Sequence, residues 1–319
     1  MEGNKLSRRD ILHKGTVAAA ALSTIPLAGF ANTNEDKNID LKTDDYWNEK
    51  SAFITGGARG IGLASAIELA KKGVNITLFD IADQIDGINY PLATERDLAS
   101  AKKIIETLGV KCLAIQGDVR NSKSLNSAVS QAVKTFGSLD FLVVNAGVTQ
   151  VGLIDYFPDN EVQVVNDINV VGSIRTVQSV LPQMRKQKFG RIVFVSSQLG
   201  RMGNNYFPVY ASTKWAVIGL TKSIASLIAT ENITSNVICP GLVDTKLVDN
   251  EYFLKGMSPQ DPTMDALNKM VKQWSPMKIG VLKAENIGIM ISRFFDEEMS
   301  LITGEVIDVS AGAGANWMA

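Results

Sequence analysis

From residue 50 onwards, short apolar runs alternate with segments whose apolar residues recur at helical spacing. Seven runs of this kind are found, at 52–54, 75–80, 110–116, 139–144, 191–195, 234–238 and 305–309. Short buried strands that alternate with helices form parallel sheets covered on both faces. The composition does not break along this stretch. The sequence therefore predicts an α/β fold, a single doubly wound domain over 48–319 with a mostly parallel seven-stranded sheet and helices on both faces.

A glycine-rich turn joins the first run to the first helical segment, and reads Thr-Gly-Gly-Ala-Arg-Gly-Ile-Gly over 55–62. Glycines let the backbone approach a pyrophosphate, and the helix N-terminus supplies free N–H groups. Asp80 ends the second run. A carboxylate at this place accepts hydrogen bonds from the adenosine ribose and repels a 2′-phosphate. The pattern predicts a Rossmann domain that binds NAD rather than NADP.

The counts of charged residues, histidine and cysteine exclude several classes. With 32 Lys+Arg against 33 Asp+Glu, the chain has no basic excess, so we expect no nucleic-acid partner. The only histidine is His13, and two cysteines cannot form a disulfide framework. Cys112 and Cys239 belong to the third and sixth runs, so we expect free, at least partly buried thiols.

The first 31 residues are typical of an export signal. Arg8 and Arg9 lie in a positive region, an apolar stretch follows over 15–31, and small residues end it at Gly29 and Ala31. The arginine pair resembles a twin-arginine signal. We predict a signal peptide over 1–31, a flexible linker over 32–47, the twin-arginine export machinery as a partner of the precursor, and a periplasmic or otherwise exported protein. The alternative is a membrane anchor formed by 15–31.

Loss of this segment would leave a chain without histidine. The mature protein would then have no Ser-His-Asp triad, no histidine-ligated metal and no imidazole base, and we expect no metal site. Acid–base chemistry would depend on Tyr, Lys, Asp, Glu or Cys.

Several further motifs lie at the ends of the predicted strands. Asp118-Val119 follows the third run, Asn145-Ala146-Gly147 the fourth, and Pro-Gly-Leu-Val-Asp-Thr at 240–245 the sixth. Ser197, Tyr210 and Lys214 have the spacing Ser-x₁₂-Tyr-x₃-Lys. In this order the motifs resemble the short-chain dehydrogenase/reductase family over about 48–319.

The resemblance implies which residues are functional. The catalytic set would be Ser197, Tyr210, Lys214 and Asn169, with Asn169 holding a water that links Lys214 to solvent. The NAD site would comprise Gly56, Arg59, Gly60, Ile61, Gly62, Asp80, Ile81, Asp118, Val119, Asn145, Ala146, Gly147, Tyr210, Lys214, Pro240, Gly241, Val243 and Thr245.

Tyr210 can act as the base without histidine if its pKa is lowered. A free tyrosine has a pKa near 10, and a shift of about 3 units requires roughly 4 kcal/mol. One cation about 4 Å away supplies about that much at an effective dielectric of 20. Lys214 is four residues after Tyr210 on a helical pattern, so both project from one face. We expect Lys214 and the positive nicotinamide ring to tune Tyr210, while Ser197 holds the substrate oxygen.

Residues 81–96 form an insertion between the second strand and the next helix. Its Asp-Ile and Tyr-Pro-Leu-Ala-Thr elements resemble the carveol-dehydrogenase-like subgroup, whose members include enzymes that hold NAD without releasing it. Ile85, Ile88, Tyr90 and Leu92 are candidates to cover the adenosine. Our hypothesis is that NAD is loaded before export, trapped partly by this insertion and recycled in place. The alternative is a surface loop without a cofactor role.

Residues 246–276 lie where the family places its substrate lid, and are rich in methionine and aromatic side chains. Such a surface suits a hydrophobic secondary alcohol or ketone. The predicted function is hydride transfer between NAD and such a substrate. The alternatives are an epimerase or lyase with permanently bound NAD and a non-catalytic NAD-binding sensor. From the family we also expect a homotetramer.

Overall fold

The structure, a computed structural model, describes residues 46–316. The predicted signal peptide, the alternative membrane anchor at 15–31 and the linker up to residue 45 lie outside the described residues. Within 46–316, no helix is both long and apolar enough to cross a membrane.

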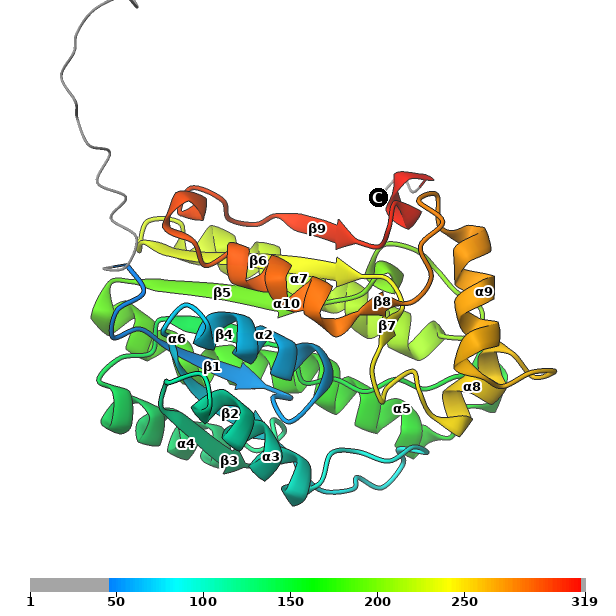
Figure 1. The fold of residues 1–319 in the computed structure, drawn as a ribbon, viewed down its shortest axis with the longest axis horizontal. Coiled ribbons are helices and arrows are strands. Elements are labelled where there is room, and N and C mark those ends of the chain that lie inside the picture. Colours follow the sequence, from blue (N-terminus) through cyan, green and yellow to red (C-terminus); the bar gives the residue numbers. More distant parts are fainter. Residues whose placement is uncertain (1–45, 317–319) are drawn as a thin grey trace, which may run out of the picture. The chain divides into compact units, whose positions relative to one another are not determined.

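Seven parallel strands form one sheet in the order β3-β2-β1-β4-β5-β6-β9 (Figure 1). The strands are β1 Ser51–Thr55, β2 Asn75–Asp80, β3 Cys112–Gln116, β4 Phe141–Val144, β5 Gly190–Val195, β6 Ile233–Pro240 and β9 Val306–Val309. The chain runs outwards from β1 to one edge, then returns to β4 and proceeds to the other edge. The predicted doubly wound sheet of seven strands is confirmed.

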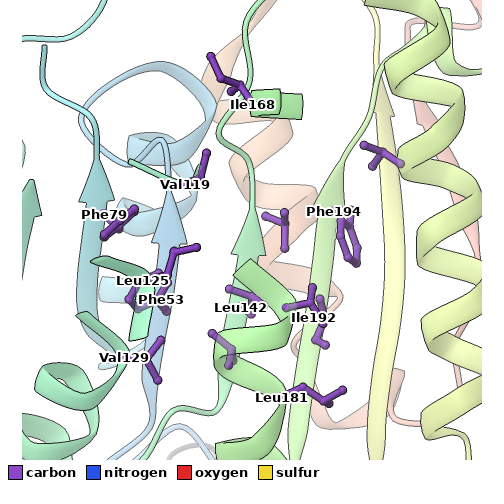
Figure 2. Close-up of a cluster of buried hydrophobic side chains, with 14 of the residues drawn as sticks. Phe53, Phe79, Val119, Leu125, Val129, Leu142, Ile168, Leu181, Ile192 and Phe194 are labelled. Atoms are coloured by element: carbon purple, nitrogen blue, oxygen red, sulfur yellow. The ribbon is translucent and has the colours of Figure 1, made fainter. Parts of the chain in front are cut away.

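Helices cover both faces of this sheet (Figure 1). One face carries α2 Gly60–Ala70, α3 Glu95–Glu106 and α10 Ala284–Arg293, and the other carries α4 Ser122–Phe136, α6 Gly172–Gln187 and α7 Pro208–Ile228. Each strand contributes side chains to the hydrophobic core on both faces, because successive side chains point to opposite faces of the sheet. Phe53 joins Phe79, Leu142 and Phe194 on the second face (Figure 2), whereas Ile54 packs on the first.

Two helices and a short second sheet lie beyond the carboxyl end of β6. They are β7 Val243–Asp244, α8 Glu251–Met257, α9 Met264–Trp274 and β8 Leu282–Lys283, and β7 pairs with β8. The helices fall within the segment 246–276 that the sequence predicts as a lid. Asn250 and Thr263 cap their N-termini, each accepting a backbone N–H.

The remaining elements are short segments, most of which lie in the connections between strands. They are η1 Ile154–Tyr156, α5 Asp159–Asn166, η2 Asp167–Val171, η3 Gln198–Gly200, η4 Glu297–Met299 and η5 Ala313–Asn316. Of these, η2 is one turn of π-helix between α5 and α6.

Two predicted boundaries move by two residues. Tyr46 and Trp47, placed in the linker by the sequence, pack against the first-face core, and the Tyr46 hydroxyl donates to the carbonyl of Phe295 at 2.8 Å. The insertion ends at Thr94, because α3 begins at Glu95 with Thr94 and Asp97 forming a capping box.

Both cysteines are free and buried, as predicted. Cys112 lies on β3 and Cys239 on β6, and four strands separate β3 from β6 in the sheet. Burial raises the pKa of Cys112 to about 12 and that of Cys239 to about 11.

Candidate functional site

Two adjoining cavities lie at the carboxyl ends of the strands. The first extends from the glycine-rich turn to the insertion, and the second lies between β5, α7 and the lid segment. Ile61, Asn145, Gly147, Thr245 and Leu247 line both. A ligand with two ends can therefore occupy both cavities at once, which suits a dinucleotide.

The glycine-rich turn opens the first cavity. Gly56 and Gly60 have φ values of +65° and +57°, a region that favours glycine. A Cβ at Gly62 would lie 2.1 Å from the carbonyl oxygen of Gly56, so no side chain fits there. No side chain caps the N-terminus of α2, and its first N–H groups remain available to an anion. The turn fits the pyrophosphate of a dinucleotide.

Asp80 stands at the end of β2 beside this turn and is 7% exposed. Its two carboxylate oxygens accept the backbone N–H groups of Ala58 at 3.0 Å and Ala82 at 3.1 Å. Burial raises the pKa of Asp80, and the backbone hydrogen bonds and Arg59 oppose that rise. Each oxygen keeps a lone pair for a ribose hydroxyl, because an ionised carboxylate has about four acceptor sites. The geometry fits NAD and disfavours a 2′-phosphate.

Asp118 lines the same cavity, but its carboxylate is bound to Arg120. The closest contact is 2.6 Å, and the Arg120 Nε and backbone N–H also donate to it. This ion pair raises the pKa of Arg120. Arg59 also has a partner, since its Nη2 donates to the carbonyl of Pro91 in the insertion at 2.7 Å. The sequence did not predict either contact.

Asn145 cross-links the ends of β1 and β4. Its side-chain Nδ2 donates to the carbonyls of Thr55 and Gly56, each at 3.0 Å, and its backbone N–H donates to the Thr55 hydroxyl at 3.0 Å. The Ala146 N–H donates to the same hydroxyl. Asn145 therefore orients the glycine-rich turn against the segment that enters the second cavity.

The insertion folds over the first cavity. Ile85 and Tyr90 are buried and line it, and the half-buried Leu92 lines it too. Ile88, also predicted to cover the adenosine, is buried but does not line this cavity. Gln84 closes the loop on itself, since its side chain donates to the carbonyls of Ile88 and Tyr90 and accepts the Leu92 N–H. Figure 1 shows the insertion running from the end of β2 towards α5.

Ser197, Tyr210 and Lys214 meet in the second cavity. Ser197 follows β5 and caps η3, accepting the Leu199 N–H at 3.1 Å. Tyr210 and Lys214 lie on one face of α7, and the Tyr210 side chain hydrogen-bonds Ser197. The Lys214 Nζ donates to the Val195 carbonyl at 3.0 Å and stands 5.5 Å from the centre of the Tyr210 ring.

The pKa of Tyr210 is not lowered by Lys214 in the way the sequence led us to expect. Burial raises the pKa of Tyr210 to about 12, and the hydrogen bond with Ser197 only partly opposes this. Burial also lowers the pKa of Lys214 to about 8. Desolvation penalises the charged form of each group. In the chain by itself, burial thus outweighs the hydrogen bond with Ser197 and keeps the pKa of Tyr210 above its ordinary value.

Asn169 lies beside this group but lines neither cavity. It sits in η2, and its side chain accepts the Val148 N–H and donates to the Val148 carbonyl, both at 2.9 Å. A Cβ at Gly147 would lie 3.3 Å from Asn169 Oδ1 and 3.4 Å from Lys214 Nζ, so all three are neighbours. Its predicted link to a water remains a prediction.

The remaining predicted residues are distributed between the two cavities. The first is lined by Gly56, Arg59, Gly60, Ile61, Asp80, Ile81, Asp118, Val119, Asn145, Ala146, Gly147 and Thr245, and the second by Tyr210, Lys214, Pro240, Gly241, Val243 and Thr245 as well as Ser197. Gly62 lines neither, because it packs behind the turn. The structure thus brings the predicted set together, while the role of each residue remains a prediction.

A comparison with family models matches residues 50–252 to the short chain dehydrogenase model. The chain belongs to the short-chain dehydrogenase family. The match covers β1 through the start of α8 and includes both cavities' principal residues. The family predicted from the motifs is confirmed.

Individual relatives cover most of the domain. An uncharacterized oxidoreductase of Mycobacterium tuberculosis is 36% identical over 270 residues, which are 82% of this chain and 95% of the relative. The (-)-trans-carveol dehydrogenase of Rhodococcus erythropolis is 32% identical over 265 residues, 82% of this chain and 96% of the relative.

Among solved structures, carveol dehydrogenase from Mycobacterium avium in complex with NAD is 31% identical. It has a TM-score of 0.81, and the match covers 84% of this chain and 98% of that one. The prediction of NAD as the cofactor is confirmed, as is that of carveol dehydrogenases among the relatives.

The sequence missed the contacts that attach the insertion to the rest of the site. The Tyr90 hydroxyl accepts the Thr149 N–H at 3.0 Å, and the Gln150 side chain donates to the Gly87 carbonyl at 2.7 Å. The sequence shows that the insertion contains a tyrosine, but it does not show that this Tyr90 binds Thr149, more than fifty positions away.

Proposed function

We propose that this chain is an NAD-dependent short-chain dehydrogenase that interconverts a hydrophobic secondary alcohol and its ketone. The observation that carries the proposal is one cavity that holds Ser197, Tyr210 and Lys214 and adjoins the cavity of Asp80. When bound, NAD supplies the acceptor for the hydride. Its holders would be Asp80 at the ribose, the N-terminus of α2 at the pyrophosphate, and Lys214 with the segment 240–245 at the nicotinamide end.

In the proposed mechanism, Ser197 donates a hydrogen bond to the substrate oxygen and fixes its position. Tyr210 takes the hydroxyl proton when an alcohol is oxidised and returns it when a ketone is reduced. Because burial raises the pKa of Tyr210 to about 12, a further positive charge is needed for it to act as a base. Protonated Lys214 supplies part of that charge, and the oxidised nicotinamide ring would supply the rest when NAD is bound.

The hydrophobic nature of the substrate is supported by the walls of the second cavity. Leu199, Phe207, Phe253, Met257 and Trp274 contribute to them. Two dehydrogenases of carveol, a small cyclic alcohol, are similar to this chain over 82% and 84% of its length. Among the described residues that line this cavity, Lys214 is the single cation, so a phosphorylated or CoA-linked substrate has no obvious counter-ion there.

A single-turnover assay tests this function. NAD-loaded protein is mixed with carveol, and absorbance at 340 nm is followed. We expect one equivalent of NADH per site in the wild type and none in Tyr210→Phe, with the same NAD content in both. An epimerase or lyase would convert its substrate without net NADH, so product analysis without a lasting 340 nm change would favour that alternative. Undiminished turnover by Tyr210→Phe would refute the assignment of the base.

We further propose that the insertion retains NAD. Ile85, Tyr90 and Leu92 line the nucleotide cavity, and the bond from Arg59 to Pro91 ties the loop to the turn that would hold the pyrophosphate. The protein is purified, dialysed, denatured and assayed for released nucleotide. We expect close to one NAD per chain. An empty protein that binds added NAD weakly and reversibly would contradict retention.

Export rests on the sequence alone. We propose that the twin-arginine machinery exports the precursor, that residues 1–31 are removed, and that the mature enzyme acts outside the cytoplasm as a homotetramer. Fractionation of cells expressing the wild type and an Arg8→Lys/Arg9→Lys variant tests the route, and N-terminal sequencing tests the cleavage. Recovery of the uncleaved chain in membranes would support the anchor alternative. Sedimentation analysis tests the tetramer.

A further inference from the structure

The segment 148–151 passes between the two cavities, and we call it the crossing segment. Val148 lines the first cavity and Thr149 the second. It belongs to no strand or helix, so ladder bonds do not satisfy its backbone. Buried backbone groups nonetheless need partners, and here side chains from elsewhere supply them.

Two tyrosines bind the crossing segment from opposite ends of the site. Tyr90 of the insertion accepts the Thr149 N–H at 3.0 Å. Tyr252 of α8 makes a paired contact with one residue, accepting the Val151 N–H at 3.1 Å and donating to the Val151 carbonyl at 3.0 Å. A single phenolic hydroxyl has one donor and can accept as well, so Tyr252 uses both capacities at Val151.

The two tyrosines also contact each other. Their rings are stacked, with centres 6.5 Å apart and planes at 22°. Tyr90 is 4% exposed. The insertion over the nucleotide cavity and α8 of the lid segment are therefore packed together through the two rings and the crossing segment.

The approach of α8 to the crossing segment is close. A Cβ at Gly256 would lie 2.5 Å from Val151 Cγ1, so the helix reaches this position only because residue 256 lacks a side chain. Gln150 adds a bond on the other side, to Gly87 of the insertion. Displacement of α8 would thus disturb the segment that also anchors the insertion.

We propose that Tyr252 and Tyr90 couple the substrate lid to the cover over the cofactor, so that the seating of α8 slows nucleotide release. This inference rests on the proposed function, since it takes the first cavity as the NAD site. Tyr252 lines neither cavity. It is therefore a positioning residue, which acts on the nucleotide through Val151, Thr149 and Tyr90. Coupling of this kind is reciprocal, so a bound nucleotide also steadies the lid.

The test uses the full-length protein loaded with NAD and measures the rate at which bound NAD exchanges for radiolabelled NAD. Tyr252→Phe removes the two hydrogen bonds and keeps the ring. We expect exchange about tenfold faster, because the substitution leaves the partly buried N–H and carbonyl of Val151 without the partner that holds them. Gly256→Ala, which forces α8 away with the hydroxyl intact, should have the same effect. The control is Tyr156→Phe in η1, a tyrosine that is 79% exposed, and should leave exchange unchanged.

Combination of Tyr90→Phe with Tyr252→Phe tests whether the two act as one unit. Coupled residues are not additive, so we expect the double variant to exchange NAD no more than about twofold faster than the faster single variant. If the double variant instead exchanged NAD faster by the product of the two single effects, the proposal that the two tyrosines act as one unit would be overturned.

Hydrogen exchange provides a readout that does not depend on NAD. In nucleotide-free protein, Tyr252→Phe should raise amide exchange both in 249–257 and in 84–92, although the second segment is far from the substitution in sequence. If exchange rises only in 249–257, Tyr252 holds the lid alone and the proposal is overturned. A protein that never carries NAD would contradict the proposed function, and the hydrogen-exchange result would still decide the coupling.

Discussion

Replacement of Asp80 by asparagine is expected to remove the preference of the nucleotide site for NAD over NADP. The carboxylate is buried and accepts the N–H groups of Ala58 and Ala82, so it cannot swing away from an incoming 2′-phosphate. Asparagine has nearly the same shape, loses the negative charge and keeps one acceptor oxygen. Arg59, which interacts electrostatically with Asp80, would then lack this opposing charge.

The magnitude follows from Coulomb's law. A carboxylate and one phosphate charge about 4 Å apart repel by about 4 kcal/mol at an effective dielectric of 20, which is roughly a thousandfold in the ratio of dissociation constants. NAD itself should bind about tenfold more weakly, because a charge-assisted hydrogen bond is stronger than the neutral bond that replaces it and one backbone N–H loses its acceptor.

Isothermal titration of nucleotide-free protein with NAD and with NADP measures both constants. The matched control is Asp118→Asn, since Asp118 lies in the same cavity but is paired with Arg120 at 2.6 Å. We expect this control to leave the NAD to NADP ratio within about threefold of the wild type. If Asp80→Asn also left the ratio within threefold, the assignment of Asp80 as the residue that excludes the 2′-phosphate would be refuted.

Three further predictions concern protonation, the thiols and the N-terminal packing. Because burial raises the pKa of Tyr210, the single-turnover rate of alcohol oxidation should rise with pH from 6 to 8 as the phenolate fraction grows. The rate of ketone reduction should stay nearly flat, because it needs the protonated phenol, which already predominates over this range. A flat pH profile for oxidation would contradict Tyr210 as the base. Cys112 and Cys239, with pKa values raised to about 12 and 11 by burial, should not react with Ellman's reagent at pH 8 until guanidinium unfolds the chain. Reaction of either thiol in the native protein would show that it is accessible. Tyr46→Phe should lower the free energy of unfolding by about 1 kcal/mol in urea titrations through loss of the bond to Phe295, and an unchanged midpoint would mean that this hydrogen bond contributes nothing net.

Sequence patterns predicted the sheet well because strand burial leaves a local signal. The runs at 75–80 and 191–195 match β2 and β5 to within one residue at each end. Boundaries that depend on distant packing were less accurate. Tyr46 and Trp47 resemble the end of a polar linker in sequence, and they belong to the fold because Phe295 and the first-face core lie beside them.

The candidate site divides in the same way. Gly56, Asp80, Ser197, Tyr210 and Lys214 were identifiable because their spacing follows strand ends and a helix face. Their electrostatics were not, since desolvation depends on everything packed around a group. The expected lowering of the Tyr210 pKa by Lys214 is opposed by the burial of both side chains in the same cavity.

By itself, the sequence determined that strands and helices alternate along the chain and that an acidic residue follows a glycine-rich turn. It also determined that Ser197, Tyr210 and Lys214 have the spacing of a catalytic motif. These features are local or periodic, so they can be recognised from residues that are close together in the sequence. Only the tertiary structure decided that Tyr252 and Tyr90 meet on the crossing segment, that Arg120 forms an ion pair with Asp118, and that burial raises the pKa of Tyr210. Such contacts join residues that the chain brings together only after the sheet has formed, because hydrogen bonding and desolvation act through space rather than along the sequence.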